Sequence, residues 1–304
     1  MFDAALSTMW GIGQFENLAD FFAAGSALGF TRFELNHGVN SAMLRSARLN
    51  GHCITSVHEP CPADVSASML KERNWLISAP DEGDRQIGVA AVQRSIDLAR
   101  DLGARVVIVH PGRVDIDPGL EATVAQLFRE GKADEPEYAQ AKERLMAARA
   151  AQAEINLRSV RRSLIELADY AARQGIRLGL ENRYYYHEIP LLDELDDLLS
   201  LDCGGVVGYW HDVGHAQVLE NMGLGAHEEW LRRFSHCIVG AHLHDIVGLY
   251  DHLAAGLGRM DWDMVARYLP DDALRTCEFR NTSLPQQLAD GLVRLAEKGL
   301  VGQV

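Results

Sequence analysis

Eight short apolar runs alternate with longer amphipathic stretches along the chain, and this alternation restricts the fold more than any other feature. The apolar runs predict strands over residues 5–10, 32–36, 53–58, 105–110, 176–182, 205–212, 237–244 and 274–279. The stretches between them predict helices over 18–28, 42–49, 86–102, 153–173, 191–199, 227–234, 264–269 and 286–298. Continuous β-branched runs are typical of parallel strands that are buried on both faces. The alternation therefore predicts an α/β protein with a single (β/α)8 barrel over residues 1–304.

Composition and short motifs exclude several other classes of protein. The 304 residues are 47% hydrophobic and 24% charged, which is ordinary for a globular chain and excludes wholesale disorder. No GxGxxG or GxxxxGK[ST] is present to cradle a nucleotide phosphate. The formal charge of −14 and the lack of a long apolar run predict neither a nucleic-acid partner nor a membrane partner. Five cysteines without a CxxC favour a cytoplasmic protein, and a homo-oligomer is left open.

Two connections are longer than a barrel needs. The connection 63–85 contains a helix start, with Ser78 as a candidate N-cap ahead of acidic residues. The connection 112–151 is rich in Ala, Glu, Lys and Arg and predicts a helical excursion after the fourth strand. A long connection in a compact domain is usually functional or separately structured. Residues 112–151 therefore form either a lid over the barrel mouth or a helical excursion on the surface.

Polar side chains follow six consecutive predicted strands at the point where each strand ends. These ends are VHEP at 57–60, HPG at 110–112, LENR at 180–183, HDVGH at 211–215, HLHD at 242–245 and EFR at 278–280. The carboxyl ends of barrel strands meet at one mouth, where barrel enzymes carry out their chemistry. Because side chains alternate between faces with period two, Gly179 and Gly240 lie beneath Glu181 and His242 and leave room there.

The combination of these side chains predicts a metal site, although a lone histidine at a strand end is more often structural. Two glutamates, an aspartate and several histidines that point at one volume would repel and desolvate each other without a cation. Oxygen and nitrogen ligands suit manganese, magnesium, cobalt or zinc. Cysteine is absent from these strand ends, which argues against a purely structural zinc site.

These motifs, in this order and spacing, resemble the xylose isomerase-like TIM barrels, which include sugar isomerases, sugar epimerases and endonuclease IV. The resemblance covers the third to the eighth strand, about three quarters of the chain. In the epimerase branch it implies one metal ion held by Glu181, Asp212, His242 and Glu278. It also implies that Glu181 and Glu278 act as acid and base and that His215 contacts substrate.

The endonuclease IV branch implies a larger metal cluster. There the same four ligands are joined by the residues matching His58, His110, His215 and His252, together with one further aspartate. That aspartate precedes the last histidine by two positions, where this chain has Tyr250. The departure puts the third metal and phosphodiester cleavage in doubt, whereas His58 and His110 remain candidates for a second metal or for a substrate hydroxyl.

The residue types at these strand ends can perform the chemistry of an isomerase. Moving a proton beside a carbonyl requires a base, an acid and a Lewis acid that holds the developing enediolate. Glu181 and Glu278 lie three strands apart in the ring and can flank a substrate. Candidate substrate-binding residues at the mouth are Arg183, Trp210, His244 and Arg280, although rim salt bridges and plain packing are the ordinary roles of such side chains.

The sequence thus predicts a metal-dependent isomerase or epimerase of a small sugar or a related polyol ketone. Two alternatives stay open: a metal-dependent phosphodiesterase of the endonuclease IV type, and a barrel that binds metal but serves as a non-catalytic subunit.

Overall fold

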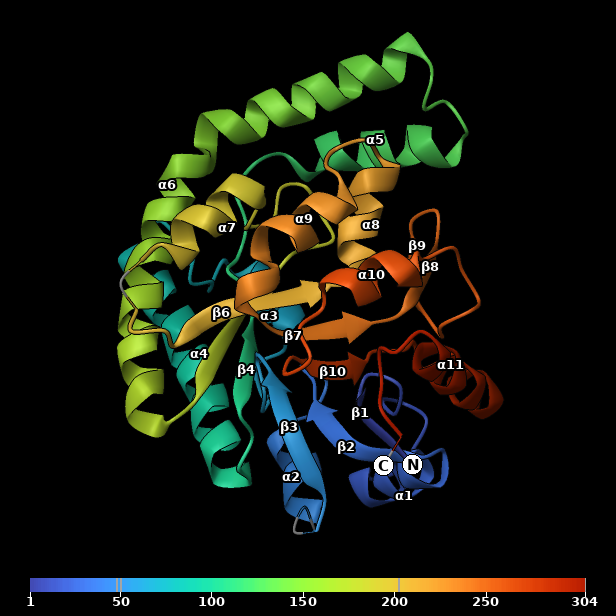
Figure 1. Ribbon diagram of the computed structural model, residues 1–304. Coiled ribbons are helices and arrows are strands. Elements are labelled where there is room, and N and C mark those ends of the chain that lie inside the picture. The colour runs from blue at the N-terminus through green and yellow to red at the C-terminus, as the bar shows by residue number, and fades with distance from the viewer. Residues whose placement is uncertain (48, 50, 202, 304) are drawn as a thin grey trace.

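Eight parallel strands close into a barrel, as the sequence predicts (Figure 1). The computed structural model describes residues 1–304 except residues 48, 50, 202 and 304. Around the barrel the strands follow the order β1-β10-β7-β6-β5-β4-β3-β2. Their bounds are β1 (Phe2–Ser7), β2 (Phe30–Leu35), β3 (Cys53–His58), β4 (Val106–Val109), β5 (Arg177–Glu181), β6 (Val207–Asp212), β7 (Ile238–Leu243) and β10 (Leu274–Cys277).

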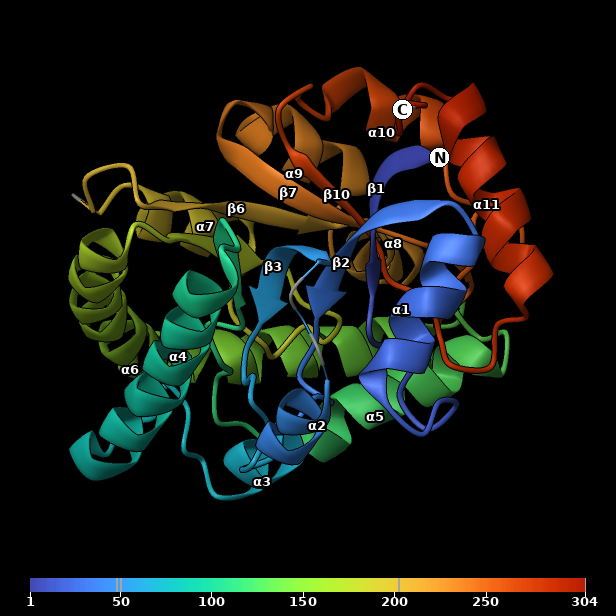
Figure 2. The ribbon, with the colours of Figure 1, turned by 90° about the horizontal axis from the view of Figure 1, so that it is seen from below.

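Helices surround this barrel, and the view from below shows them on its outside (Figure 2). Their bounds are α1 (Leu18–Ala27), α2 (Ser41–Ser46), α3 (Ala67–Glu72), α4 (Glu82–Leu102), α5 (Pro118–Arg129), α6 (Pro136–Gln174), α7 (Leu192–Leu199), α8 (Val213–Asn221), α9 (His227–Phe234), the 3-10 helix η1 (Ser235–Cys237), α10 (Trp262–Tyr268) and α11 (Pro285–Glu297). Each predicted helix has an observed counterpart. The prediction 42–49 corresponds to α2, and its residue 48 lies outside the described residues.

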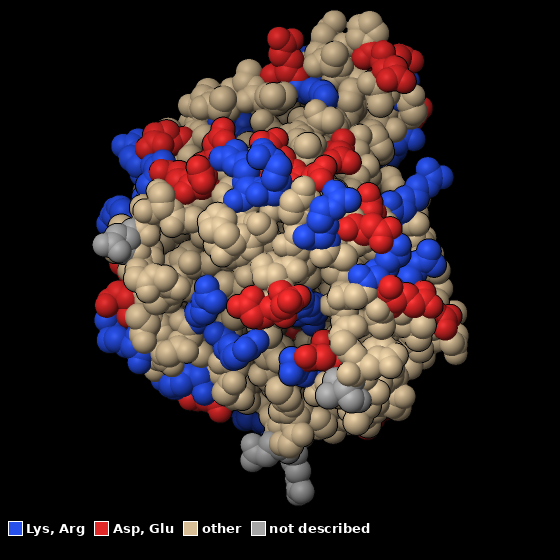
Figure 3. Space-filling model, viewed as in Figure 1, with Lys and Arg blue, Asp and Glu red and all other residues tan. Residues whose placement is uncertain are grey.

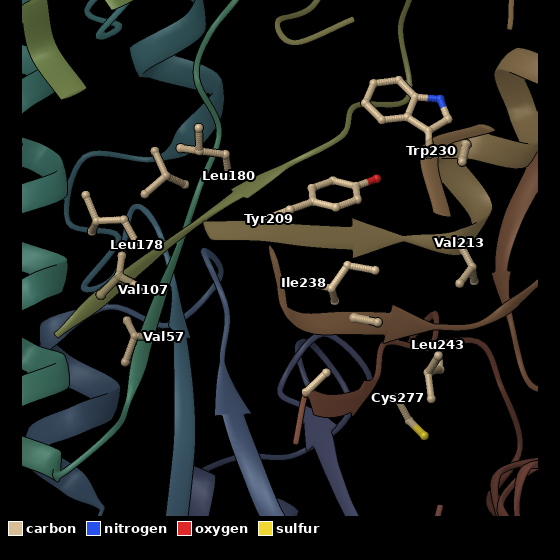
Figure 4. Packing of buried hydrophobic residues seen from close by; sticks show 14 of the residues in the cluster. Val57, Val107, Leu178, Leu180, Tyr209, Val213, Trp230, Ile238, Leu243 and Cys277 are labelled. Carbon is tan, nitrogen blue, oxygen red and sulfur yellow. The ribbon is translucent and has the colours of Figure 1, made fainter. Parts of the chain in front are cut away.

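Side chains on each strand alternate between the outward face, which packs in the hydrophobic core, and the inward face, which leads to the site. Val57, Val107, Leu178 and Leu180 point outward and pack beneath the helices, and Figure 4 shows Leu180 near Tyr209 of the neighbouring strand in this layer. Neighbouring residues on the same strands face the barrel axis instead. The apolar residues in the barrel interior form a second, smaller cluster of Val106, Ile108, Trp210, Val239 and Leu274. The polar strand ends lie above this cluster, so the strand pattern itself places them at one mouth.

The start of α4 corrects one local prediction. The helix begins after Asp81, whose side chain accepts a hydrogen bond from the Asp84 N–H and is therefore the N-cap. Ser78, which we expected as the cap, lies beside the connection that follows β4 and accepts the Arg113 N–H through its Oγ at 3.1 Å. The predicted helix start is right, but the cap is wrong because a residue three positions later holds the first turn.

The connection after β4 is helical, as predicted. It contains α5 and the first part of α6, a helix of 39 residues whose later part is the predicted helix 153–173. Figure 1 shows α5 beside the first turns of α6, in green at the top of the view. Tyr138 of α6 donates a hydrogen bond to the Met222 carbonyl after α8, at 2.8 Å. The role of this segment as a lid stays a prediction.

Several further elements were not predicted. They are α3 between β3 and α4, α8, which follows β6 directly, the short η1, and an antiparallel pair of short strands, β8 (Asp245–Val247) and β9 (Tyr250–Leu253). The hairpin carries His252 back to the mouth of the barrel.

The surface gives no sign of a basic face in the view of Figure 3, where acidic and basic residues are interspersed. Within the part of the chain that the structure describes, none of the helices has both the length and the apolar composition needed to cross a membrane.

Candidate active site

Four buried side chains from four strands meet around one imidazole nitrogen. His242 Nδ1 lies 2.7 Å from Glu181 Oε1, 3.4 Å from Asp212 Oδ2 and 3.2 Å from Glu278 Oε2. One ligand atom from each of the four residues lies within 4.8 Å of the others. Glu181 and Asp212 end β5 and β6, His242 is one residue before the end of β7, and Glu278 follows β10, so the structure brings together the four ligands that the resemblance implies.

The electrostatics of this group suit a cation. Burial raises the pKa of Asp212, but His215 and His244 outweigh that effect and hold it well below its usual range. Burial lowers the pKa of His242, yet Glu278 and Glu34 raise it well above the ordinary histidine value. The three buried carboxylates thus stabilise a positive charge at the point where they meet, which is the imidazole of His242. A divalent metal ion bound there would satisfy the same requirement with ligands of the appropriate kind.

Glu34 is a fully buried carboxylate that the sequence analysis missed. It lies on β2, and its Oε1 is 3.2 Å from His242 Nε2, on the side of the ring away from the other carboxylates. Ser56 Oγ donates to Glu34 Oε2 at 2.8 Å and fixes its position. A carboxylate that accepts the Nε2 proton leaves Nδ1 free as a ligand, which is how proteins commonly orient a metal-binding histidine. The sequence feature that could have revealed Glu34 is an acidic residue between Phe33 and Leu35 in a buried strand.

Asp212 is held in place from its backbone and from its side chain. Asn182 accepts the Asp212 N–H at 2.8 Å and donates to the Asp212 carbonyl at 2.8 Å. The His215 N–H donates to Asp212 Oδ1, so the carboxylate also caps α8. His244, which we expected to bind substrate, is fully buried, with Nε2 3.0 Å from Asp212 Oδ1 and Nδ1 accepting the His252 N–H. Both of its ring nitrogens are therefore engaged within the protein, one of them by Asp212.

His58 and His110 lie on the other side of Glu181, as the strand ends predict. His110 Nε2 is 2.8 Å from Glu181 Oε2, and His58 Nε2 is 3.7 Å from the same oxygen. Arg183 forms an ion pair with that oxygen too. Burial raises the pKa of Glu181, but Arg183, His110 and His242 outweigh it and hold this pKa well below the usual range. Arg183 Nε is buried and makes no hydrogen bond among the described residues, and it lies 3.5 Å from Glu188 Oε2 in a second ion pair.

A third group consists of Asp212, His215 and His252, whose ligand atoms also lie within 4.8 Å of one another. His252 has a φ of 56°, a left-handed conformation that is uncommon for a histidine and typical of functional positions. Next to it, Asp251 has Oδ1 3.0 Å from His252 Nδ1 and Oδ2 3.9 Å from His215 Nε2. Although Tyr250 occupies the position of the expected aspartate, the neighbouring Asp251 brings a carboxylate to this group.

Trp210 has a different role from the one that we expected. It is fully buried and packs in the barrel interior, with its ring centroid 5.2 Å from that of His242, so it forms the floor and not a wall of the mouth. A Cβ on Gly240 would lie 2.2 Å from Trp210 Cζ3, and one on Gly179 would lie 3.2 Å from Trp210 Cβ. Glycine at these two positions therefore makes room for the indole, which supports the four ligands from below.

The mouth is a chamber of about 150 Å³ above this floor. Its lining consists of Met9, His37, His58, His110, Glu181, Arg183, His215, His252 and Glu278. Burial, together with the nearby His58, lowers the pKa of His37 to about 4, so this imidazole is neutral at pH 7. Arg280, another predicted substrate-binding residue, lies outside the chamber and donates to Asp251 from Nε and Nη2, each at 2.6 Å. The chamber combines anionic, cationic and neutral polar groups in a small buried volume.

Comparison with known proteins gives the relationships of this chain. The family model described as "Xylose isomerase-like TIM barrel" matches residues 22–297. An uncharacterized protein of Sinorhizobium fredii, y4fM, is 24% identical over 218 residues; the match spans 71% of this chain and only 57% of that protein.

Solved structures resemble the chain over nearly its full length. A D-tagatose 3-epimerase-like protein superposes with a TM-score of 0.68 at 19% identity, covering 97% of this chain and 96% of the other. The IOLI protein, described with a bound zinc atom, gives a TM-score of 0.63 at 13% identity, with coverages of 98% and 96%. At these identities the likeness concerns the fold.

Proposed function

Because the chain belongs to the xylose isomerase-like TIM-barrel family, we propose that it is a divalent-metal-dependent isomerase or epimerase of a small sugar or a related polyol ketone. One observation carries the proposal: three buried carboxylates surround His242 Nδ1 beneath a chamber lined by an arginine and several histidines. Ligands of this type in a small polar chamber suit a substrate with several oxygens. The D-tagatose 3-epimerase-like protein has the same fold and supports the reaction class.

The residues that would hold the metal ion are Glu181, Asp212, His242 and Glu278. Their oxygen and nitrogen atoms suit manganese, magnesium, cobalt or zinc, and the zinc in the IOLI protein shows that this fold can hold such an ion. When bound, the ion would act as a Lewis acid on the carbonyl oxygen of the substrate. Glu34 and His244 would keep His242 and Asp212 in the orientation that this requires.

Glu181 and Glu278 are the proposed proton-transfer groups. Both line the chamber, and they come from β5 and from the end of β10, which are separated by β6 and β7 in the barrel. One carboxylate takes the proton from the carbon beside the carbonyl, and the other returns a proton to the opposite face for epimerisation. Arg183 lies against Glu181 and lines the chamber, where its guanidinium can donate to a substrate hydroxyl.

We propose that His58 and His110 bind substrate and do not hold a second metal ion. Both approach Glu181 Oε2, but the guanidinium of Arg183 contacts the same oxygen. A fixed positive charge at that oxygen disfavours a second cation there. His110 donates or accepts a hydrogen bond equally well, which suits a sugar hydroxyl.

Proton exchange with solvent tests the proposal directly. Protein loaded with manganese, cobalt, magnesium or zinc is incubated in heavy water with ketohexoses, ketopentoses and ring ketones of hexoses, and NMR follows the carbon-bound protons. We expect metal-dependent deuterium incorporation beside the carbonyl, about one metal ion per chain by elemental analysis, and a lower melting temperature after chelation. Turnover that is unaffected by removal of all metal would contradict the mechanism. A protein that binds metal but exchanges no proton would favour the non-catalytic subunit.

A metal-dependent phosphodiesterase is the second candidate. The group of Asp212, His215 and His252, with Asp251 beside it, favours it because these residues could hold a further metal ion. Incision of duplex DNA at an abasic site tests this function. We expect none, since the net charge of −14 opposes binding to phosphates. Metal-dependent incision at nanomolar protein would reverse the ranking of the two functions.

A further inference from the structure

A second chamber opens beside the barrel mouth. It has a volume of about 280 Å³ and is lined by Met9, Ile12, Asn36, His37, Gly38, Tyr250, Arg280, Asn281 and Thr282. Met9 and His37 line both this outer chamber and the mouth chamber, so the two adjoin across these side chains. The chain segments after β1, β2 and β10 and the β8–β9 hairpin build its walls.

The size of the mouth chamber suggests that it holds only part of a ligand. Its volume of about 150 Å³ is below the range of ~300–1,000 Å³ that is usual for small-molecule sites, and the outer chamber brings the total into that range. The other hollow that reaches the mouth, through His110, has about 30 Å³ and holds about one water molecule. Among the described residues, the outer chamber is therefore the direction in which a larger substrate can extend.

The chemistry of the outer chamber fits a neutral polar group with an apolar face. Met9 and Ile12 supply apolar surface, and Asn281 and Thr282 supply amide and hydroxyl groups. Tyr250 is 50% exposed, and the guanidinium of Arg280 lies 4.1 Å from its ring centroid. Arg280 is the one charged lining residue, and its ion pair with Asp251 compensates that charge. An anionic group would find no uncompensated cation here.

We propose that the substrate is a glycoside, with its ketone-bearing ring in the mouth chamber and the attached sugar or other neutral group in the outer chamber. This inference rests on the proposed function and narrows its substrate. In a glycoside the anomeric carbon is locked in an acetal, so the carbonyl must lie at another ring carbon. The reaction then moves one proton from the carbon beside that ketone and returns one to the other face, and no redox partner is consumed.

Filling the outer chamber tests the proposal. Ile12→Trp places a large ring in that chamber and leaves every residue of the mouth chamber unchanged. Thr282→Trp is a second variant, from the segment after β10 that also lines this chamber, in case the first does not fold. Val293→Trp, at an exposed position of α11, is the matched control for adding an indole.

The substrates are two ring-ketone glucosides that differ only in the group at the anomeric oxygen, a glucosyl or a methyl group. With manganese-loaded protein, we expect the glucosyl compound to have a kcat/KM at least about tenfold higher, the usual scale for one additional filled subsite. Ile12→Trp should remove this ratio and leave the kcat/KM of the methyl compound within about twofold, whereas Val293→Trp should keep the ratio.

Equal kcat/KM for the two compounds in the wild-type protein would overturn the glycoside proposal and leave the isomerase proposal standing. Exchange with neither compound nor with any free ketose would instead overturn the isomerase proposal. In that case calorimetry with an unreactive disaccharide decides the inference: binding that Ile12→Trp weakens would support the outer subsite, and no binding would exclude it.

Discussion

Two pairs of buried histidines lie on opposite sides of the barrel wall and differ in charge. The mouth pair is His242 and His252, which both face carboxylates. The rear pair is His211 and His227, which lie behind β6, where His211 Nε2 is 3.0 Å from His227 Nε2. The rear pair ends on neutral groups: Tyr209 Oη is 2.6 Å from His211 Nδ1, and Gln217 Oε1 is 3.1 Å from His227 Nδ1.

The difference shows what carboxylates do to a buried imidazole. Burial lowers the pKa of His227 to about 4 and holds that of His211 well below its usual range. Burial acts in the same direction on His252, but Asp251 and Glu278 reverse the effect and raise its pKa to about 10. Burial alone thus produces neutral histidines that serve as structure, whereas the carboxylates turn an equally buried cluster into a place for positive charge.

Removal of the proposed proton-transfer groups at the mouth should lower the turnover number more than any other change considered below lowers its measured quantity. Glu181→Gln and Glu278→Gln each keep the size of the side chain and one ligating oxygen. We expect each to lower the turnover number at least about 100-fold, the usual scale for a positioned acid or base, measured by the exchange rate in heavy water. Glu297→Gln, on the exposed side of α11, is the control. Near-normal turnover in both mouth variants would mean that these residues only hold the metal, and His58 and His110 would become the candidate bases.

The next effect concerns the rear pair, which should lower the stability of the folded protein as the pH falls. His227 binds a proton more weakly in the folded state, where its pKa is about 4, than in the unfolded state, near 6.5. Its presence therefore costs no stability above pH 6.5, and the cost grows as the pH falls toward 4. Between pH 7.5 and 5.0 this amounts to about 2 kcal/mol of the free energy of unfolding.

Urea denaturation of His227→Gln against the wild type measures that change. When the pH is lowered from 7.5 to 5.0, the difference in the free energy of unfolding between the two proteins should change by about 2 kcal/mol in favour of the variant. The exposed His236, outside this hydrogen-bond chain, provides the control variant His236→Gln. A difference that is constant with pH would show that burial does not lower the pKa of His227 in the folded protein.

Substitution of Glu34 should produce the weakest of these effects, a modest loss of metal affinity. Glu34→Gln keeps an acceptor for His242 Nε2 but removes the charge that makes the ring a better ligand. We expect metal affinity to fall about tenfold, the lower end of the range for such supporting residues, measured by calorimetric titration with manganese. Ser56→Ala removes only the hydrogen bond that holds Glu34 and should cost less. Equal affinity in Glu34→Gln and the wild type would show that this carboxylate plays no part in metal binding.

The sequence predicted the barrel and the meeting of polar strand ends at one mouth because both depend on local pattern, whereas the choice of four ligands among them came from the family resemblance. Period-two alternation decides which face Glu181 and Asp212 occupy, and parallel strands in a closed barrel bring their ends together. Glu34 was missed because its partner His242 is distant in sequence and no local feature links them. Trp210 was placed at the mouth, on the correct face of β6, but its depth depends on glycines in neighbouring strands. The pairing of β8 with β9 likewise depends on contacts that a short polar segment does not reveal.

The indole floor has a consequence for how barrels of this kind can be redesigned. In many barrels the interior layers are filled jointly by side chains from alternate strands. Here Trp210 occupies the space that glycines at 179 and 240 vacate. The support beneath His242 therefore depends on one large side chain that takes no part in the proposed chemistry. An engineer could alter the support beneath His242 by exchanging that residue for a smaller one, without changing any of the four ligands.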